Sequence, residues 1–302
     1  MSVTQRTAIL TAAAITGLAA AVTTTAAAAS ASPAAAAASP SPPRDAVAAP
    51  HPATGARAAA PGGTWGTAQQ VPGTAALNKG GEAGIRSVSC ARAGSCSAGG
   101  FYADASGDRQ AFVAGEANGI WGQAQQVPGT AALNTGGSAE ISSVSCARAV
   151  SCSAGGSYTD ASGHLQAFVA GEVKGVWGPA EEVPGTAALN KGGEAGISSV
   201  SCARAGSCSA GGSYIDASNR RQAFVAGEVK GVWGQAEEVP GTAALNKRGF
   251  AAIISVSCAR AGSCSAGGHY KDASGHIQAF VAGEVKGVWG QAEEVPRHRG
   301  PE

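Results

Sequence analysis

Eight cysteines stand in four pairs with the spacing Cys-x5-Cys, and disulfide formation is the chemistry that this pattern favours. An even number of cysteines at a fixed spacing is typical of the disulfide framework of an exported protein. Two antiparallel strands joined by a short turn bring facing Cα atoms to about 4.5–5.5 Å, which a disulfide can span. A metal site or a redox pair is the alternative, but thiols outside the cell are open to oxidation and redox pairs usually read Cys-x2-Cys. We therefore predict the disulfides Cys90–Cys96, Cys146–Cys152, Cys202–Cys208 and Cys258–Cys264.

Aspartate and asparagine residues recur at equivalent positions and are the candidate ligand-binding residues. They are Asp104, Asp160, Asp216 and Asp272, together with Asn78, Asn134, Asn190 and Asn246. Loops on a rigid scaffold commonly carry binding groups, and carboxylate and amide side chains suit sugar hydroxyls or calcium. In the alternative interpretation, each Asp begins a turn and each Asn caps a loop through local hydrogen bonds. The sequence leaves both interpretations open.

A catalytic constellation is not evident in the chain. No GxSxG, P-loop or HExxH motif is present in the sequence. Of the five histidines, His269 and His276 flank one turn, but no third metal ligand accompanies them. Near-identical repeats would also give several equal sites, whereas catalysis favours one asymmetric site. We therefore expect no catalytic residues, no metal, no cofactor and no enzymatic activity.

A 56-residue repeat organises all of these side chains. Its markers are Trp65, Trp121, Trp177, Trp233 and Trp289, and the cysteine pairs keep the same step. In the copy that starts near residue 141, strands are expected over residues 141–147, 152–160, 166–173 and 176–183. Turn residues separate them: Asp160 and Gly163 between the second and third strands, and Lys174-Gly175 between the third and fourth. Self-similarity at so long a period indicates a propeller, a solenoid or an array.

Four antiparallel strands per repeat predict an all-β, propeller-like ring of four four-stranded blades. A β-solenoid or a linear repeat array is the alternative. Pro179 supports an edge position for the fourth strand, because proline cannot donate to a ladder. The Trp strand occurs five times, so an extra copy over residues 64–72 either closes the ring or remains unpaired. The predicted β-repeat domain covers residues 64–296, and packing between blades is the expected role of the tryptophans.

The segments outside the repeats predict export. Residues 1–31 combine Arg6, an apolar stretch and small residues, as a signal peptide does. Residues 32–63 are rich in Ala, Pro and Ser and are expected to be a disordered linker, and residues 297–302 form a tail. A formal net charge of +1 disfavours nucleic acid as a partner. We expect an extracellular protein, free or associated with the cell wall, without a membrane span after signal cleavage.

The repeated motifs also resemble a known group of proteins. The segments WGxAxxVPGTAALN, SVSCARAGSCSAGG, YxDASG and QAFVAGE are similar to tandem repeats in secreted proteins of actinomycetes, most of which have no assigned function. This resemblance covers residues 64–295 and implies an extracellular location and a propeller-like fold. It supplies no catalytic residues.

These observations lead to three hypotheses about function. The first is a non-enzymatic, multivalent binding module that recognises cell-wall or environmental glycans, so that a polysaccharide or cell-wall component is the expected partner. The second is an extracellular structural or matrix protein that self-assembles through its repeats. The third is a secreted hydrolase, which the missing constellation disfavours.

Overall fold

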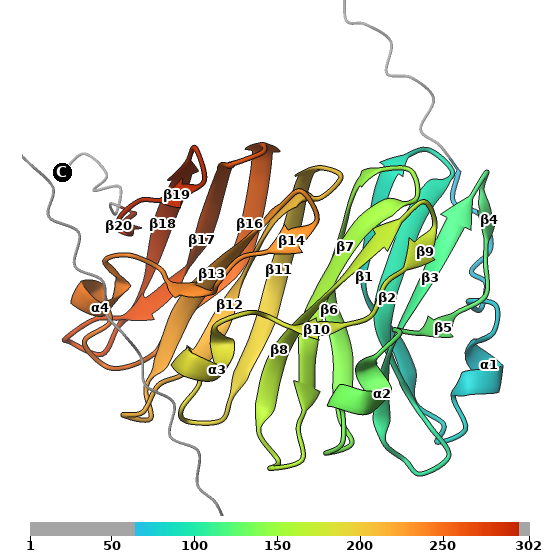
Figure 1. Ribbon diagram of the computed structural model, residues 1–302, viewed down its shortest axis with the longest axis horizontal. Helices are drawn as coiled ribbons and strands as arrows, with labels where there is room; N and C mark the ends of the chain where they lie inside the picture. The colour runs from blue at the N-terminus through green and yellow to red at the C-terminus, as the bar shows by residue number, and fades with distance from the viewer. Residues whose placement is uncertain (1–63, 296–302) are drawn as a thin grey trace, which may run out of the picture. The chain divides into compact units, whose positions relative to one another are not determined.

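The computed structural model describes residues 64–295, which form four similar five-stranded antiparallel sheets (Figure 1). Sheet 1 contains β1 (Ala83–Arg92), β2 (Ser95–Ala103), β3 (Arg109–Ala117), β4 (Ile120–Trp121) and β5 (Gln125–Gln126). Sheet 2 contains β6 (Ala139–Arg148), β7 (Ser151–Thr159), β8 (Leu165–Val173), β9 (Val176–Trp177) and β10 (Glu181–Glu182). Sheet 3 contains β11 (Ala195–Arg204), β12 (Ser207–Ile215), β13 (Arg221–Val229), β14 (Val232–Trp233) and β15 (Glu237–Glu238). Sheet 4 contains β16 (Ala251–Arg260), β17 (Ser263–Lys271), β18 (Ile277–Val285), β19 (Val288–Trp289) and β20 (Glu293–Glu294). The all-β repeat architecture predicted from the 56-residue period is thereby confirmed.

The fourth strand of each repeat is broken into two short pieces that both pair with the third strand. In sheet 2 the break falls between β9 and β10, where Pro179 lies. On either side of Pro179, the Gly178 N–H donates to the Gly171 carbonyl at 2.8 Å and the Ala180 N–H donates to the Pro128 carbonyl at 2.7 Å. The backbone therefore needs no donor at the proline itself, and the expected edge position is observed.

Short helices, for which the sequence analysis gave no prediction, lie in the segments that precede the first strand of each sheet. They are α1 (Thr74–Leu77), α2 (Thr130–Leu133), α3 (Thr186–Leu189) and α4 (Thr242–Leu245). Each has the sequence Thr-Ala-Ala-Leu and follows a glycine with a positive φ, such as Gly185 at 86°. A single helical turn gives no periodic pattern, so only the helix-forming alanines and the preceding glycine could have indicated it.

Each sheet packs its face on the next sheet, and most of the core lies in the three junctions between them. A smaller cluster around Phe112 lies between sheet 1 and the segment that contains Val71 and Leu77. In the junction between sheets 1 and 2, Ile141 and Phe168 of sheet 2 pack with Val113 of sheet 1. Glycine allows this close approach: a Cβ at Gly155 would lie 2.8 Å from Ile197 Cγ2 and 2.9 Å from Val200 Cγ2 of sheet 3. The junctions therefore combine a flat glycine surface with branched side chains.

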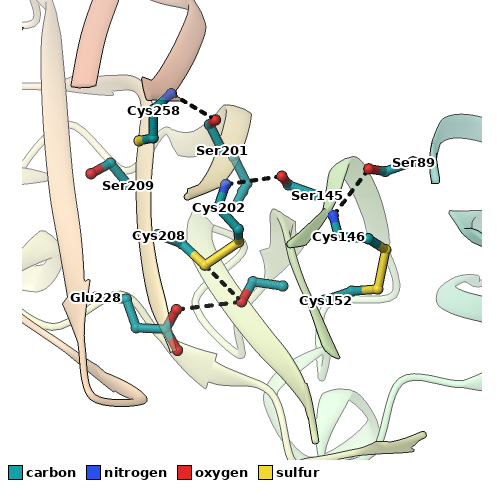
Figure 2. The surroundings of a disulfide bond; sticks show 12 residues. Ser89, Ser145, Cys146, Cys152, Ser201, Cys202, Cys208, Ser209, Glu228 and Cys258 are labelled. Carbon is teal, nitrogen blue, oxygen red and sulfur yellow. Dashed lines mark hydrogen bonds between the residues drawn. A yellow bond between two sulfur atoms is a disulfide. The ribbon is translucent and has the colours of Figure 1, made fainter. Parts of the chain in front are cut away.

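Serine hydroxyls link the first strands of neighbouring sheets. The N–H groups of Val144 and Cys146 on β6 donate to Ser87 Oγ and Ser89 Oγ on β1, both at 3.0 Å. Equivalent bonds join β6 to β11 and β11 to β16, and Figure 2 shows one of them at each junction. These hydroxyls cover backbone donors along a strand edge that would otherwise be open to pairing with another chain.

All four predicted disulfides are present, one in the first hairpin of each sheet. The bonded cysteines face each other directly in the strand register, as in Cys202↔Cys208. Their Cα atoms are 3.9–4.0 Å apart, closer than the spacing expected for facing residues. Four disulfides are typical of a protein that folds in an oxidising compartment.

The four sheets do not close into a ring within the described residues. No strand pairing joins sheet 4 to sheet 1 in this part of the chain, and Figure 1 shows the sheets in a row, which corresponds to the predicted alternative of a linear array. Residues 64–72 form no strand, and the Trp65 side chain is 98% exposed, so the extra Trp segment remains unpaired. The predicted signal peptide, linker and tail lie outside the described residues. Among residues 64–295, no helix has the length and apolar character to cross a bilayer.

Candidate functional site

The recurring aspartates lie in the turns between the second and third strands, where their own hairpins engage them. Asp160 Oδ1 accepts the backbone N–H groups of Ser162 and His164 at 2.8 and 3.0 Å, and its Oδ2 accepts the Gln166 side chain at 2.8 Å. The pKa of the Asp104, Asp160 and Asp272 carboxyls is lowered, chiefly by this glutamine hydrogen bond. The geometry gives these residues a turn-stabilising role, and their binding role stays a prediction.

The recurring asparagines lie in the segments before the first strand of each sheet and, except for Asn78, donate to the preceding sheet. Asn190 Nδ2 donates to the Leu165 carbonyl at 3.0 Å, and its Oδ1 accepts the Glu194 N–H at 2.7 Å. Asn134 and Asn246 make the same contacts and are likewise buried. Asn78 differs, because its Oδ1 is buried without a hydrogen-bond partner among the described residues. The asparagines and aspartates therefore lie in one part of each repeat, but their side chains are engaged by nearby groups of the protein.

The two histidines near the last turn have separate partners. The His269 ring stacks on Phe250 at 5.2 Å between centroids, whereas His276 Nδ1 lies 3.9 Å from Asp272 Oδ2. No cluster of three or more His, Cys, Asp or Glu suited to a metal ion occurs in residues 64–295.

A cavity opens at each of the three junctions, close to the disulfide hairpins. These junction pockets have volumes of about 240 Å³ between sheets 1 and 2, 340 Å³ between sheets 2 and 3, and 490 Å³ between sheets 3 and 4. They share a wall made by one serine and one glutamate of the preceding sheet, and by a cysteine, a glutamate and a tryptophan of the following sheet. The walls contain Ser97, Glu116, Cys152, Glu172 and Trp177; Ser153, Glu172, Cys208, Glu228 and Trp233; and Ser209, Glu228, Cys264, Glu284 and Trp289.

The glutamate that each following sheet supplies is buried. Glu172, Glu228 and Glu284 are only 5–7% exposed, and burial raises the pKa of all three carboxyls. Ser153 Oγ donates to Glu228 Oε2 at 3.5 Å, and Ser209 Oγ donates to Glu284 Oε2 at 3.3 Å (the first of these bonds is drawn in Figure 2). Glu172 Oε2 has no hydrogen-bond partner among the described residues. A buried carboxylate with spare acceptor capacity can receive a hydroxyl or an ammonium group from a ligand.

Each junction pocket also has more carboxylates than cations. Between sheets 2 and 3, Glu181 joins the two buried glutamates, and Arg204 is the cation that lines the pocket. Between sheets 3 and 4, the pocket is lined by the carboxylates of Glu228, Glu237 and Glu284 and by the cations Arg204 and Lys286. The pockets therefore suit uncharged or cationic ligands better than anions.

These glutamates are not among the candidate residues selected from the sequence. The strand period gave a signal: Phe168, Ala170 and Glu172 alternate with Val169 and Gly171, so the glutamate shares the face of the buried phenylalanine. Three of the tryptophans have the expected packing role: Trp177, Trp233 and Trp289 are buried in the junction cores and also line the pockets. Trp65, in contrast, is 98% exposed.

Comparisons with known proteins find only distant similarity. No protein-family model matches the chain. No curated protein sequence matches it. Among solved structures, it is similar to the Hadza microbial sialidase Hz136, with 11% identity and a TM-score of 0.45 over 69% of this chain and 45% of that one. It is also similar to a subtype N11 neuraminidase-like protein of A/flat-faced bat/Peru, with 12% identity and a TM-score of 0.34 over 68% and 56% of the two chains. The chain thus spans about half the length of each of these proteins, and similarity of this degree does not extend to the residues of a site.

Proposed function

We propose that this protein is a secreted, non-enzymatic module that binds polysaccharide at several equivalent sites, one at each junction between sheets. The observation that carries the proposal is the recurrence of one pocket wall, with serine, glutamate and tryptophan, at all three junctions. An indole presents an apolar surface to the C–H face of a sugar ring, while the carboxylate and the hydroxyl take up its polar groups.

Several weak, equivalent sites along one row of sheets favour a polymeric ligand. Once one unit of a polysaccharide is bound, the remaining pockets meet its other units at a high effective concentration, and affinities multiply. The excess of carboxylates sets the preference within this class. We expect neutral glycans and amino sugars to bind, and uronic or other acidic glycans to be rejected.

Binding is tested by titrating the disulfide-bonded protein with chitin oligomers, chitosan oligomers, peptidoglycan fragments and an acidic glycan. Glu284 lines one pocket, whereas Glu172 and Glu228 each line two. We therefore expect binding to fall stepwise through Glu284→Gln, the double variant with Glu228→Gln, and the triple variant with Glu172→Gln. The matched control is Asp160→Asn with Asp216→Asn, which changes two of the candidate ligand-binding aspartates and leaves the pockets intact.

Each outcome has a clear meaning. Stepwise loss in the glutamate series alone supports the junction pockets. Loss in the aspartate control alone would instead place the site at the turns that contain Asp160 and Asp216. No binding to any of the glycans contradicts the proposed function. Release of new reducing ends, abolished by one substitution, would contradict the non-enzymatic assignment. Secretion is tested separately, by recovering the protein from culture medium and sequencing its new N-terminus, which we expect near residue 32.

A further inference from the structure

The outer face of sheet 1 carries the residues of a junction, but within residues 64–295 no sheet packs on it, and only Val71 and Leu77 cover its part around Phe112. Ile85 is 40% exposed and Val88 is 55% exposed, whereas the equivalent Ile141 and Val144 are 0% and 5% exposed. The N–H groups of Val88 and Cys90 are equivalent to those of Val144 and Cys146, yet no serine of a preceding sheet accepts from them within the described residues. This face, with Asn78 beside it, is called the leading face below.

The outer face of sheet 4 is the opposite half of a junction, and it is open as well. Val281 is 45% exposed, whereas the equivalent Val169 and Val225 are fully buried. A Cβ at Gly267 would have nothing within 3.8 Å, although at the equivalent Gly211 it would lie 2.6 Å from Ile253 Cγ2. This face, formed by Gly267, Ala279 and Val281 and flanked by Ser255 and Ser257, is called the trailing face.

We propose that the leading face of one copy of this chain packs on the trailing face of another, forming a fourth junction of the kind already present three times within the chain. Continuity with these internal junctions identifies a second copy as the occupant. The contact is heterologous, so copies join head to tail, and the rotation per junction decides whether they close as a ring or continue as a filament.

The hydrogen-bonding groups at the two faces match at the same register. At internal junctions, the N–H groups of Leu165 and Arg221 donate to the carbonyls of Gly193 and Gly249, both at 2.9 Å. At the proposed junction the equivalent bond runs from the Ile277 N–H to the Gly81 carbonyl. Asn78 would then reach the Ile277 carbonyl, as Asn190 reaches that of Leu165 at 3.0 Å. This contact uses Asn78 Nδ2, because in the equivalent asparagines Oδ1 accepts an N–H of its own loop.

The serine acceptors of the trailing face also match the N–H donors of the leading face. Ser255 and Ser257 are equivalent to Ser199 and Ser201, which accept the N–H groups of Val256 and Cys258 at 3.0 and 2.9 Å. They would accept those of Val88 and Cys90. At the first junction, Arg86 pairs with Glu140 at 3.3 Å. The equivalent positions at the proposed junction are Ile254 and Gly84, so an apolar side chain meets a glycine and no unpaired charge is buried.

The fourth-strand position at the proposed junction is already filled. Trp289 of β19 pairs with Glu284 of β18, so sheet 4 is complete without the extra Trp segment. Residues 65–72 line a cavity beside Glu116 and Trp121 of sheet 1, just as residues 122–125 line the first junction pocket beside Glu172 and Trp177. They therefore lie where β19 and β20 of the other copy belong, and docking requires residues 65–72 to leave this place.

Sedimentation of the purified full-length protein with its disulfides formed, over a wide concentration range, tests the proposal. We expect reversible association of the wild type, so that its average mass rises with protein concentration. Val88→Lys blocks the leading face and Gly267→Gln blocks the trailing face, and each is expected to weaken association at least ~10-fold. Both positions are open in the single chain, so both variants should fold. Val232→Lys, at an exposed position of β14 in sheet 3 and on neither end face, is the matched control and should associate as the wild type does.

Mixing the two blocked variants gives the decisive readout. Each variant retains one intact face, so an equimolar mixture should form a dimer with a single junction, while neither variant alone associates. A wild type that stays monomeric at all concentrations, or association that survives both substitutions, would overturn the proposal. A blocked pair that fails to form the dimer would also overturn it, because a head-to-tail contact requires that complementation. None of these outcomes depends on glycan binding.

Discussion

The three internal junctions and the two end faces of the row are built from the same residues in different surroundings. Ile141 in the first junction is inaccessible to solvent, whereas Ile85, at the equivalent place on the leading face, is 40% exposed. Gly211 faces Ile253 at a junction, and Gly267 faces nothing. The comparison shows that the role of a residue in this protein is set by whether a neighbouring sheet is present, and only secondarily by the local sequence.

The largest difference is expected for truncation of the junction isoleucines. Ile253→Ala removes a fully buried side chain between sheets 3 and 4 and leaves a cavity, so the free energy of unfolding should fall by about 2–5 kcal/mol. Ile85→Ala removes the equivalent, half-exposed side chain and should cost less than about 1 kcal/mol. Urea unfolding of both variants at low protein concentration, where copies stay apart, makes the measurement. Equal losses would show that the leading face is covered in the single chain.

Adding a methyl group at the glycines tests the same comparison from the other direction. In Gly211→Ala the new Cβ would lie 2.6 Å from Ile253 Cγ2, and overpacking of this kind costs about 1–3 kcal/mol. Gly267→Ala places a methyl group on the open trailing face and should be neutral within about 0.5 kcal/mol. Thermal unfolding of the two variants, compared with the wild type, checks the difference. A destabilised Gly267→Ala monomer would argue against an open trailing face.

The serine links should distinguish the junctions from the ends by a smaller amount. Ser145→Ala removes the acceptor of the Cys202 N–H, a bond of 2.9 Å, and leaves that donor without its partner. We expect a loss of about 1 kcal/mol in the free energy of unfolding. Ser257→Ala, at the equivalent position of sheet 4, should have no effect on the monomer. Hydrogen exchange at the Cys202 amide would report the lost bond directly, and unchanged protection there would contradict the assignment.

Position 150 is valine in sheet 2 and glycine at the equivalent place in the other sheets, so it gives a control that concerns the conformation of one hairpin. Val150 lies in the first hairpin of sheet 2 with a φ of 55°, where the other copies have Gly94, Gly206 and Gly262. A β-branched residue is strained in this left-handed conformation. Val150→Gly should raise the free energy of unfolding by about 0.5–1 kcal/mol after the added flexibility of the unfolded chain is counted. Denaturant unfolding that shows no gain would mean that Val150 side-chain contacts offset the strain.

The smallest effect concerns the pH dependence of a junction glutamate. Burial raises the pKa of Glu172 above its ordinary value of 4.5, so the folded state binds a proton more tightly than the unfolded state. Its contribution to stability is therefore lost as the pH rises from about 4.5 through the raised pKa. Glu172→Gln removes this dependence, so the variant should gain stability relative to the wild type as the pH increases from 4 to 7. Unfolding curves at several pH values would reveal the trend, and a constant difference would contradict it.

Much of the repeat could be predicted from local features. The cysteine spacing predicted every disulfide, and the turns at Asp160 and Lys174 placed the hairpins within a residue or two of their observed bounds. Pro179 identified the edge strand, although not the break within it. These features are local because hairpin register depends on residues a few positions apart.

The arrangement of the sheets and the pockets could not be predicted in the same way. Ile85 and Ile141 occur in nearly the same sequence context, so nothing nearby indicates that one is exposed and the other buried. Closure of a ring depends on the angle between successive sheets summed over all copies, which no single repeat encodes. Glu172 was not selected as a site residue for a related reason, because the neighbouring sheet decides its burial.

The serine-to-backbone links also bear on how such a chain can change during evolution. Every junction uses the same donors and acceptors on both sides, so one more or one fewer 56-residue unit leaves each remaining contact as it was. Unequal recombination between the near-identical gene segments could therefore lengthen or shorten the protein in a single step without a misfolded intermediate. A change in the number of repeats would therefore alter the length of the row of sheets faster than point substitutions would.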